Sequence, residues 1–161
     1  DAPDQVNICL YYQSENYISH SNTRKGLLNP LYHRVRNHTL TTKYRLIQSV
    51  TGLKQGMPLD LGAGTGAFVQ FMNQKGWKSQ GIEPDETARR MALVHHQTGL
   101  LAAADFQTLP AASFDAISLW HVLEHVHELH PYMDQLKKLL KPAGRLFIAV
   151  PNYSSYDGRK Y

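Results

Sequence analysis

Residues 119–131, LWHVLEHVHELHP, concentrate side chains that can bind a metal ion or move a proton. The segment contains four histidines and two glutamates. Within it His121, Glu124 and His125 have the spacing H-x-x-E-H, in which two histidines one helical turn apart can hold a zinc ion. A histidine can also act as a general base without any metal, since its ordinary pKa lies near neutrality. The segment therefore raises two hypotheses, a zinc site and a site of acid–base chemistry.

A second candidate is the glycine-rich string LDLGAGTGAF at residues 59–68. Gly62, Gly64 and Gly66 allow the backbone to turn tightly and to approach a ligand closely, and the helix expected next presents free N–H groups. The string also satisfies the dinucleotide pattern G-x-G-x-x-A through Gly62, Gly64 and Ala67. The loop predicts a nucleotide-like cofactor but does not identify it.

Three acidic residues help to separate the possible cofactors. Asp60 precedes the glycines, where a carboxylate is unfavourable beside a pyrophosphate but favourable beside a sulfonium and an amino group. Glu83 ends a second predicted strand, where its carboxylate can accept both hydroxyls of a ribose. Asp105 can accept the adenine amino group while the ring of Phe106 covers the base. A nicotinamide dinucleotide also suits Glu83, but it does not explain Asp60 together with Asp105 and Phe106.

The elements that must position these residues alternate between strands and helices. Buried apolar runs predict strands at 57–61, 79–83, 100–103, 114–120 and 145–150, and periodicity and capping predict helices at 29–52, 67–75, 86–98 and 130–140. Five strands separated by helices imply a parallel sheet with helices on both faces. In the first helix we expect one apolar face formed by Leu31, Val35, Tyr44, Ile47 and Val50.

Length and composition are those of one globular domain. The chain has 161 residues, of which 42% are hydrophobic and 19% charged, and a formal net charge of +4. Its one cysteine, Cys9, excludes an internal disulfide and suggests a reducing compartment, which we take to be the cytoplasm. No apolar run approaches the length of a membrane span. The excess of positive charge lies in residues 1–59, where a solvated helix face is favoured over a nucleic-acid surface.

The ordered runs LDLGAGTG, GIEPD, AADFQTLPAASFDAISLWHVLEHV and LKPAGRLFIAVPN resemble the class I S-adenosylmethionine-dependent methyltransferases. The resemblance is strongest to the small-molecule branch that includes the quinone-biosynthesis O-methyltransferases, and it extends from Met57 to Asn152. It implies a Rossmann-like sheet of strand order 3-2-1-4-5 in residues 56–161, preceded by a basic helical lid in residues 1–55. Because the chain begins at Asp1 and stops at Tyr161, we expect a piece that lacks the C-terminal antiparallel strand pair of the complete fold.

The resemblance also implies roles for individual residues. Asp60 and the loop residues would hold the methionine part of S-adenosylmethionine or S-adenosylhomocysteine, Glu83 and its neighbours the ribose, Asp105 and Phe106 the adenine, and Trp120 the region near the methyl group. The full cofactor-binding set is Asp60, Gly62, Ala63, Gly64, Gly66, Glu83, Pro84, Asp105, Phe106 and Trp120. Core packing of Phe106 and a purely structural Trp120 remain open alternatives.

The resemblance argues against zinc, because His121 would directly follow a strand rather than lie within a helix, and no metal is expected. His121 becomes a candidate catalytic base, with hydrogen bonding to the backbone as the alternative. The second candidate base is His20, in a predicted lid segment that also contains Tyr12, Tyr17 and Ser19.

Together these observations predict transfer of a methyl group to an O, N or C nucleophile of a small molecule. The alternatives are a non-catalytic module that binds S-adenosylmethionine or S-adenosylhomocysteine, and an NAD(P)-linked oxidoreductase. Since the last strand would be an unpaired sheet edge, we also expect a homodimer through that edge, and weak turnover by this piece alone.

Overall fold

The structure, a computed structural model, describes residues 29–152. The chain forms two compact units, residues 1–39 and 40–161, and the boundary falls within helix α3 (Asn29–Thr51). The sheet, the helices that cover it and most of the candidate site lie within residues 40–152. The predicted lid residues Tyr12, Tyr17, Ser19 and His20 lie outside the described residues.

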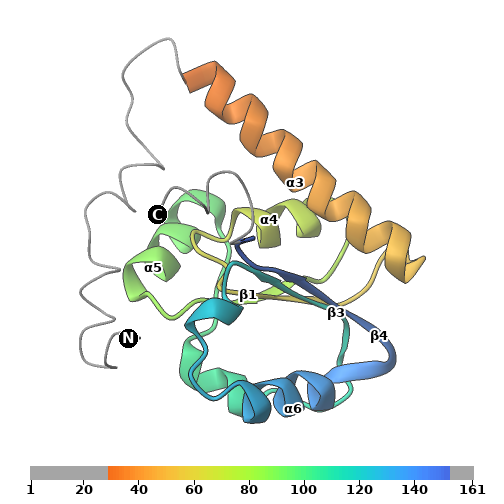
Figure 1. Ribbon diagram of the computed structural model, residues 1–161. Helices are drawn as coiled ribbons and strands as arrows, with labels where there is room; N and C mark the ends of the chain where they lie inside the picture. The colour runs from red at the N-terminus through yellow and green to blue at the C-terminus, as the bar shows by residue number, and fades with distance from the viewer. Residues whose placement is uncertain (1–28, 153–161) are drawn as a thin grey trace. The chain divides into compact units, whose positions relative to one another are not determined.

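Within residues 29–152, four parallel strands form the sheet, in the order β2-β1-β3-β4 (Figure 1). They are β1 (Pro58–Leu61), β2 (Gln80–Ile82), β3 (Phe114–Trp120) and β4 (Leu140–Ala149). All four residues of β1 are buried, as expected for a strand with neighbours on both sides and helices on both faces. The prediction of a parallel sheet with strands connected by helices is confirmed.

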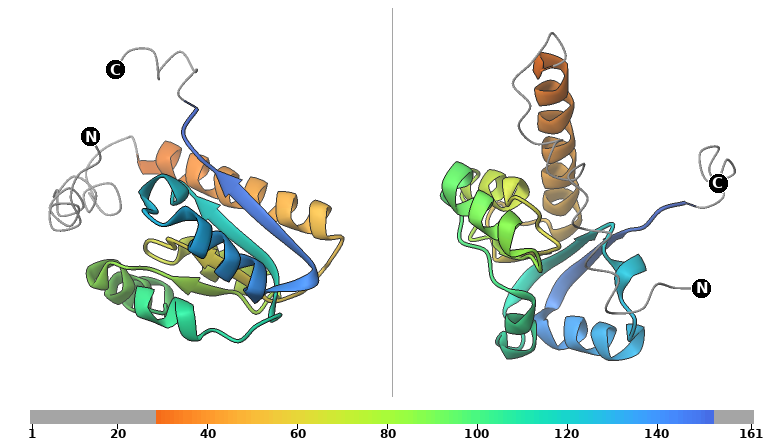
Figure 2. Two further views of the ribbon diagram at one scale, coloured as in Figure 1. Left: turned by 60° about the horizontal axis from the view of Figure 1, so that its bottom comes forward. Right: turned by 90° about the vertical axis from the view of Figure 1, so that its left-hand side faces the viewer.

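Helices α4 (Ala67–Gln74), α5 (Glu86–His96) and α6 (Leu129–Leu139) connect the strands. Side chains of β3 alternate between the two faces of the sheet. Ile117 and Leu119 pack with Leu136 of α6, whereas Ala116 packs with Phe68 of α4 on the opposite face. Figure 2 shows β3 and β4 side by side with α6 across one face. The core therefore has two layers; Ala116 and Trp120 of β3 pack on the α4 side, whereas Phe114, beyond an irregularity in the strand register, packs with the α6 cluster.

The predicted strand at residues 100–103 is wrong in its extent. Only Leu101 pairs with the sheet, through a single parallel bridge to Ile82. The Asp105 carboxylate accepts a hydrogen bond from the Ala102 N–H at 2.8 Å, and the 3-10 helix η1 (Ala103–Thr108) begins at once. The sheet has four strands instead of five, and their order agrees with the 2-1-4-5 part of the predicted order 3-2-1-4-5.

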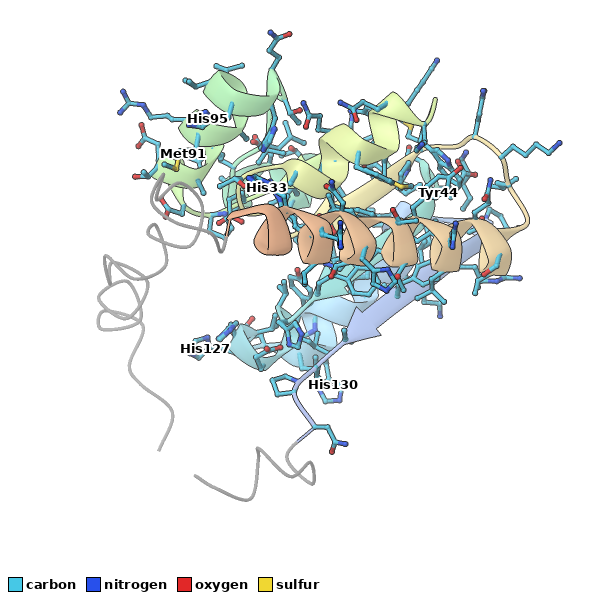
Figure 3. The ribbon with its side chains drawn as sticks, turned by 90° about the horizontal axis from the view of Figure 1, so that it is seen from above. His33, Tyr44, Met91, His95, His127 and His130 are labelled. Atoms are coloured by element: carbon cyan, nitrogen blue, oxygen red, sulfur yellow. The ribbon has the colours of Figure 1, made fainter. Side chains whose placement is uncertain are left out.

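The C-terminal part of α3 packs on the same face of the sheet as α4. Ile47 is completely buried, and the Tyr44 ring meets Phe71 of α4 edge-on at 5.9 Å between centroids (Figure 3). The predicted apolar face is wrong at Val35 and Val50, whose side chains are exposed, and Leu31 and Val35 belong to the other unit. Within residues 29–152, neither α3 nor any other helix is long and apolar enough to cross a bilayer.

Candidate functional site

The glycine loop, residues 62–66, directly follows β1, and α4 begins at Ala67, the residue after the loop. Gly62, Gly64 and Gly66 all have positive φ, of 69°, 54° and 74°. A Cβ atom at Gly62 would lie 2.5 Å from Cγ2 of Val122, whereas a Cβ at Gly64 would meet no atom within 4 Å. Gly62 is thus required for packing, while the space above Gly64 is open, as a loop that presses its backbone against a cofactor requires.

Glu83 lies one residue beyond β2 and binds the glycine loop. Its Oε2 accepts a hydrogen bond from the Gly64 N–H at 2.7 Å, and its Oε1 accepts one from the Asp85 N–H at 3.0 Å. Arg89 of α5 donates to the carbonyl oxygens of Glu83 and Pro84, both at 2.6 Å. A carboxylate oxygen has two lone-pair directions, so each oxygen of Glu83 can still accept a hydroxyl.

Asp60 is a buried carboxylate beneath the loop, with 4% of its surface exposed. Its Oδ1 accepts a hydrogen bond from the Ser118 hydroxyl at 2.6 Å, from the residue that pairs with it in β3. Burial raises the pKa of Asp60 to about 6, while the Ser118 hydrogen bond and the positive charge of Lys43 act in the opposite direction. Asp60 is therefore mostly ionised at pH 7.

Lys43, on α3, places a cation beside this carboxylate. Its Nζ lies 4.5 Å from the centroid of the Trp120 ring and 5.7 Å from that of the Phe68 ring. Burial lowers the pKa of Lys43, and the negative charge of Asp60 opposes that shift. Both aromatic rings hold the ammonium group by cation–π attraction. One carboxylate, that of Asp60, and one ammonium group, that of Lys43, thus lie at the carboxyl ends of β1 and β3.

The segment that leads to Asp105 and Phe106 starts beside Glu83, because the Glu83 N–H donates a hydrogen bond to the Leu101 carbonyl at 3.0 Å. The ring of Phe106 is 6% exposed and stacks on Tyr132 of α6 at 4.8 Å between centroids. The ring therefore belongs to the core, the Phe106 carbonyl accepts a hydrogen bond from the Gln135 side chain at 3.0 Å, and Asp105 is half-buried.

His121 directly follows β3, as predicted. Its backbone is in the left-handed region, with φ of 61°, and its N–H donates to the Ala149 carbonyl at 2.8 Å. Its side chain is 64% exposed, and Nδ1 lies 3.7 Å from Oε1 of Glu124. The imidazole is thus accessible, while the backbone is fixed by β4.

The remaining histidines of the opening segment do not converge on a metal site. His125 ends the 3-10 helix η2 (Leu123–His125), and His127 and His130 are exposed and point away from the sheet (Figure 3). Within residues 29–152, no three or more histidine, cysteine, aspartate or glutamate side chains are arranged to hold a metal ion.

Several of the predicted residues meet at one edge of the sheet. Asp60, the glycine loop, Glu83 and Trp120 all lie at the carboxyl ends of the strands, where parallel α/β sheets bind ligands. Lys43, Ser118 and Arg89 also contribute to this edge and were not predicted from the sequence. Ser118 could in principle have been predicted, because the predicted strands place it opposite Asp60, the acidic residue that precedes the glycines. Lys43 had no local signal, because its contacts are distant in the sequence. Arg89 bonds carbonyl groups only five and six residues before it, a local contact that the helix prediction did not reveal.

A separate open cavity of about 300 Å³ lies at the opposite edge, among residues that precede or begin the strands. In it Lys141 forms an ion pair with Asp115 at 2.8 Å, and the same carboxylate accepts the Met57 N–H at 2.8 Å. These groups satisfy one another, so the cavity does not compete with the glycine-loop edge as a cofactor site.

Comparison with known proteins agrees with this geometry. The methyltransferase domain family matches residues 37–161. An uncharacterized methyltransferase of Alkaliphilus oremlandii is 28% identical over 135 residues, 80% of this chain and 61% of that protein. A ubiquinone biosynthesis O-methyltransferase of Azoarcus sp. is 30% identical over 110 residues, 63% of this chain and 46% of that protein. The chain spans about half the length of most of the curated relatives it matches.

Solved structures show the same fold. The PH0226 protein of Pyrococcus horikoshii aligns with a TM-score of 0.66 at 19% identity, covering 83% of this chain and 61% of that one. A SAM-dependent methyltransferase of Archaeoglobus fulgidus aligns with a TM-score of 0.61 at 20% identity, covering 74% and 55%. With the family match over most of its length, the chain belongs to the class I S-adenosylmethionine-dependent methyltransferases and is distantly similar to the ubiquinone biosynthesis O-methyltransferases.

Proposed function

We propose that this chain supplies the cofactor-binding core of an enzyme that transfers a methyl group to an O, N or C nucleophile of a small molecule. The observation that carries the proposal is the hydrogen bond between the Gly64 N–H and Glu83. It brings the open glycine loop and a carboxylate suited to a ribose to the same edge of the sheet. A dinucleotide enzyme would share that feature but would place the buried Asp60 near a pyrophosphate, where its charge is unfavourable.

Each residue of the edge has a distinct task in this proposal. S-adenosylmethionine supplies, when bound, an electrophilic methyl group on a sulfonium. The ionised Asp60 favours the ammonium and sulfonium groups of the cofactor, and the open backbone at Gly64 admits the cofactor closely. Glu83 accepts hydrogen bonds from the ribose hydroxyls, with Pro84 and Asp85 beside it. Since methyl transfer requires alignment of two reacting atoms, positioning is the main contribution of these groups.

The adenine would be recognised through the carboxylate of Asp105. The Phe106 ring stacks in the core on Tyr132, so it does not cover the base as expected. Oδ2 of Asp105 already accepts the Ala102 N–H, and its other oxygen can accept the adenine amino group.

His121 remains the candidate base for the acceptor, because its exposed imidazole follows β3 next to Trp120. A hydroxyl acceptor gains from such a base, whereas an already nucleophilic amine or carbanion does not. His20 stays a second candidate from the sequence. Within residues 29–152, β4 has one neighbour in the sheet, β3, and we propose that a homodimer forms through its other edge.

Calorimetric titration with S-adenosylhomocysteine tests the function. Glu83→Ala should bind at least about tenfold more weakly than the original protein, since it loses charge-assisted hydrogen bonds. Glu128→Ala, which removes an exposed glutamate at the start of α6, is the matched control and should bind normally. A folded original protein whose melting temperature rises with NAD but not with S-adenosylhomocysteine would reject the proposal in favour of an oxidoreductase.

A further inference from the structure

Arg89, on α5, bonds the main chain of the turn that carries Glu83. Its Nη1 donates to the carbonyl oxygens of Glu83 and Pro84, both at 2.6 Å. Within residues 29–152, no backbone N–H donates to either carbonyl, and no carboxylate forms an ion pair with Arg89. One guanidinium nitrogen thus satisfies two carbonyl groups that the backbone leaves free. Because the donor is charged, these bonds are stronger than ordinary backbone hydrogen bonds.

The turn between β2 and α5 is held from two sides. On the side of the sheet, the Glu83 N–H donates to the Leu101 carbonyl at 3.0 Å. On the side of the helix, Asp85 caps α5 by accepting the Thr87 N–H at 2.7 Å, and Arg89 lies one turn further along. With Arg89 bonded to its carbonyl, Glu83 has both polar groups of its main chain occupied, which restricts the direction of its side chain.

The Glu83 carboxylate requires such a fixed direction because it serves the loop and the ligand at once. Its Oε2 accepts the Gly64 N–H at 2.7 Å and its Oε1 accepts the Asp85 N–H at 3.0 Å. Each oxygen therefore keeps one lone-pair direction for a ribose hydroxyl. Since hydrogen bonds weaken steeply as their angle falls, a small rotation of the Glu83 peptide would misalign both remaining directions.

We propose that Arg89 is a positioning residue for ribose recognition, which aims the Glu83 carboxylate by bridging the carbonyls of Glu83 and Pro84 and does not itself touch the cofactor. The inference rests on the proposed binding of S-adenosylmethionine and adds a residue that acts through Glu83. Selectivity for a ribose with both hydroxyls then depends on a side chain of α5. Arg90, the next residue of the same helix, is exposed and provides a matched control.

The test compares two ligands by calorimetry, S-adenosylhomocysteine and its 2′,3′-dideoxy analogue, which lacks both ribose hydroxyls. The original protein should prefer S-adenosylhomocysteine by about tenfold or more, since the analogue loses two hydrogen bonds to a carboxylate. Arg89→Met keeps an apolar stem without the donors and should reduce this preference by about threefold or more, with the affinity for the analogue unchanged. Arg90→Met should keep the full preference.

A combination of variants shows whether Arg89 acts through Glu83. In Glu83→Ala the carboxylate is absent, so adding Arg89→Met should cause no further loss of affinity for S-adenosylhomocysteine. Arg89→Lys retains a cation that can donate to a carbonyl, so it should keep part of the preference. This variant remains informative if Arg89→Met does not fold.

The outcomes separate this inference from the proposed function. If Arg89→Met weakens both ligands equally, or leaves the preference unchanged, Arg89 does not position Glu83 and the inference is overturned while the cofactor stands. A further loss on adding Arg89→Met to Glu83→Ala has the same meaning. Equal binding of both ligands by the original protein overturns the ribose role of Glu83 together with the inference. Binding of neither ligand by a folded original protein overturns the proposed function as well.

Discussion

The carboxylate of Glu83 and the backbone N–H of Gly64 are joined by a hydrogen bond of 2.7 Å, across nineteen positions of the sequence. This contact closes the crossover from β1 through α4 to β2 at its carboxyl end. The residue proposed to bind a ribose thus also fixes the loop proposed to bind the amino-acid part. Replacing Glu83 is therefore expected to remove the ligand contact and to loosen the loop at the same time.

Amide hydrogen exchange at Gly64 measures the structural half of that coupling. In Glu83→Ala the Gly64 N–H loses its acceptor, and we expect its exchange to accelerate about fivefold, the equivalent of one hydrogen bond of about 1 kcal/mol. In Glu83→Gln the side-chain carbonyl can still accept from Gly64, so the change should be smaller. Equal protection of this amide in the original protein and in Glu83→Ala would contradict the role of Glu83 as an anchor.

Asp60 makes stability depend on pH in a defined direction. Burial raises its pKa from 3.8 to about 6, so the folded state favours the protonated carboxyl. This contribution to stability is fully present below about pH 4 and is lost as the pH rises through about 6; a shift of about two units corresponds to about 3 kcal/mol. Relative to Asp60→Asn, which lacks the titration, the original protein should therefore lose stability between pH 4 and 7.

Urea unfolding of both proteins at several pH values checks this prediction, with the difference between them as the measured quantity. Binding should respond in the opposite sense, because the cofactor's amino group requires the ionised carboxylate. The affinity for S-adenosylhomocysteine should fall below about pH 6 in the original protein. A difference in unfolding free energy that does not change with pH would show that Asp60 titrates at its ordinary value.

Gly62 and Gly64 provide a matched pair of substitutions. Gly62→Ala places a Cβ atom 2.5 Å from Val122 at a φ of 69°, whereas Gly64→Ala meets no atom and suffers only from its positive φ. We expect Gly64→Ala to lower the unfolding free energy by about 1 kcal/mol and Gly62→Ala by about 2–4 kcal/mol.

The double variant Gly62→Ala with Val122→Ala identifies the cause. If the clash explains the larger effect, shortening Val122 should restore part of the loss, so that the two changes together destabilise less than their sum. Thermal or chemical unfolding is measured for the original protein, the two single variants and the double variant. Additive losses would assign the effect of Gly62→Ala to the backbone alone.

His121 holds a left-handed backbone that glycine adopts without strain, with φ of 61°. His121→Gly should therefore be as stable as the original protein or more stable by up to about 1 kcal/mol. If the imidazole is the general base, turnover on the acceptor should fall by about two orders of magnitude or more while the affinity for S-adenosylhomocysteine stays within about twofold. Unchanged turnover would leave His121 with its backbone role, the hydrogen bond to Ala149.

The order of motifs along the chain was sufficient to predict the sheet, the glycine loop and the positions of Asp60 and Glu83. Strand β3 matches its prediction residue for residue, because FDAISLW is a run of buried side chains bounded by turn residues. The third predicted strand failed because a single side chain, that of Asp105, captures the Ala102 N–H and starts a 3-10 turn. A pattern of apolar residues does not reveal such local competition for a backbone group.

Tertiary structure alone decided which groups face one another. Phe106 reads equally well as an adenine cover or a core residue, and its stacking on Tyr132 of α6 settles where the ring lies. Lys43 appeared in the sequence as one of several lysines and arginines on a basic helix, and only packing of α3 brings its ammonium group to Trp120. A site formed by one strand and the turn after it can be recognised from the local sequence. A charged side chain that another helix brings to the site depends on how the helix and the strand pack.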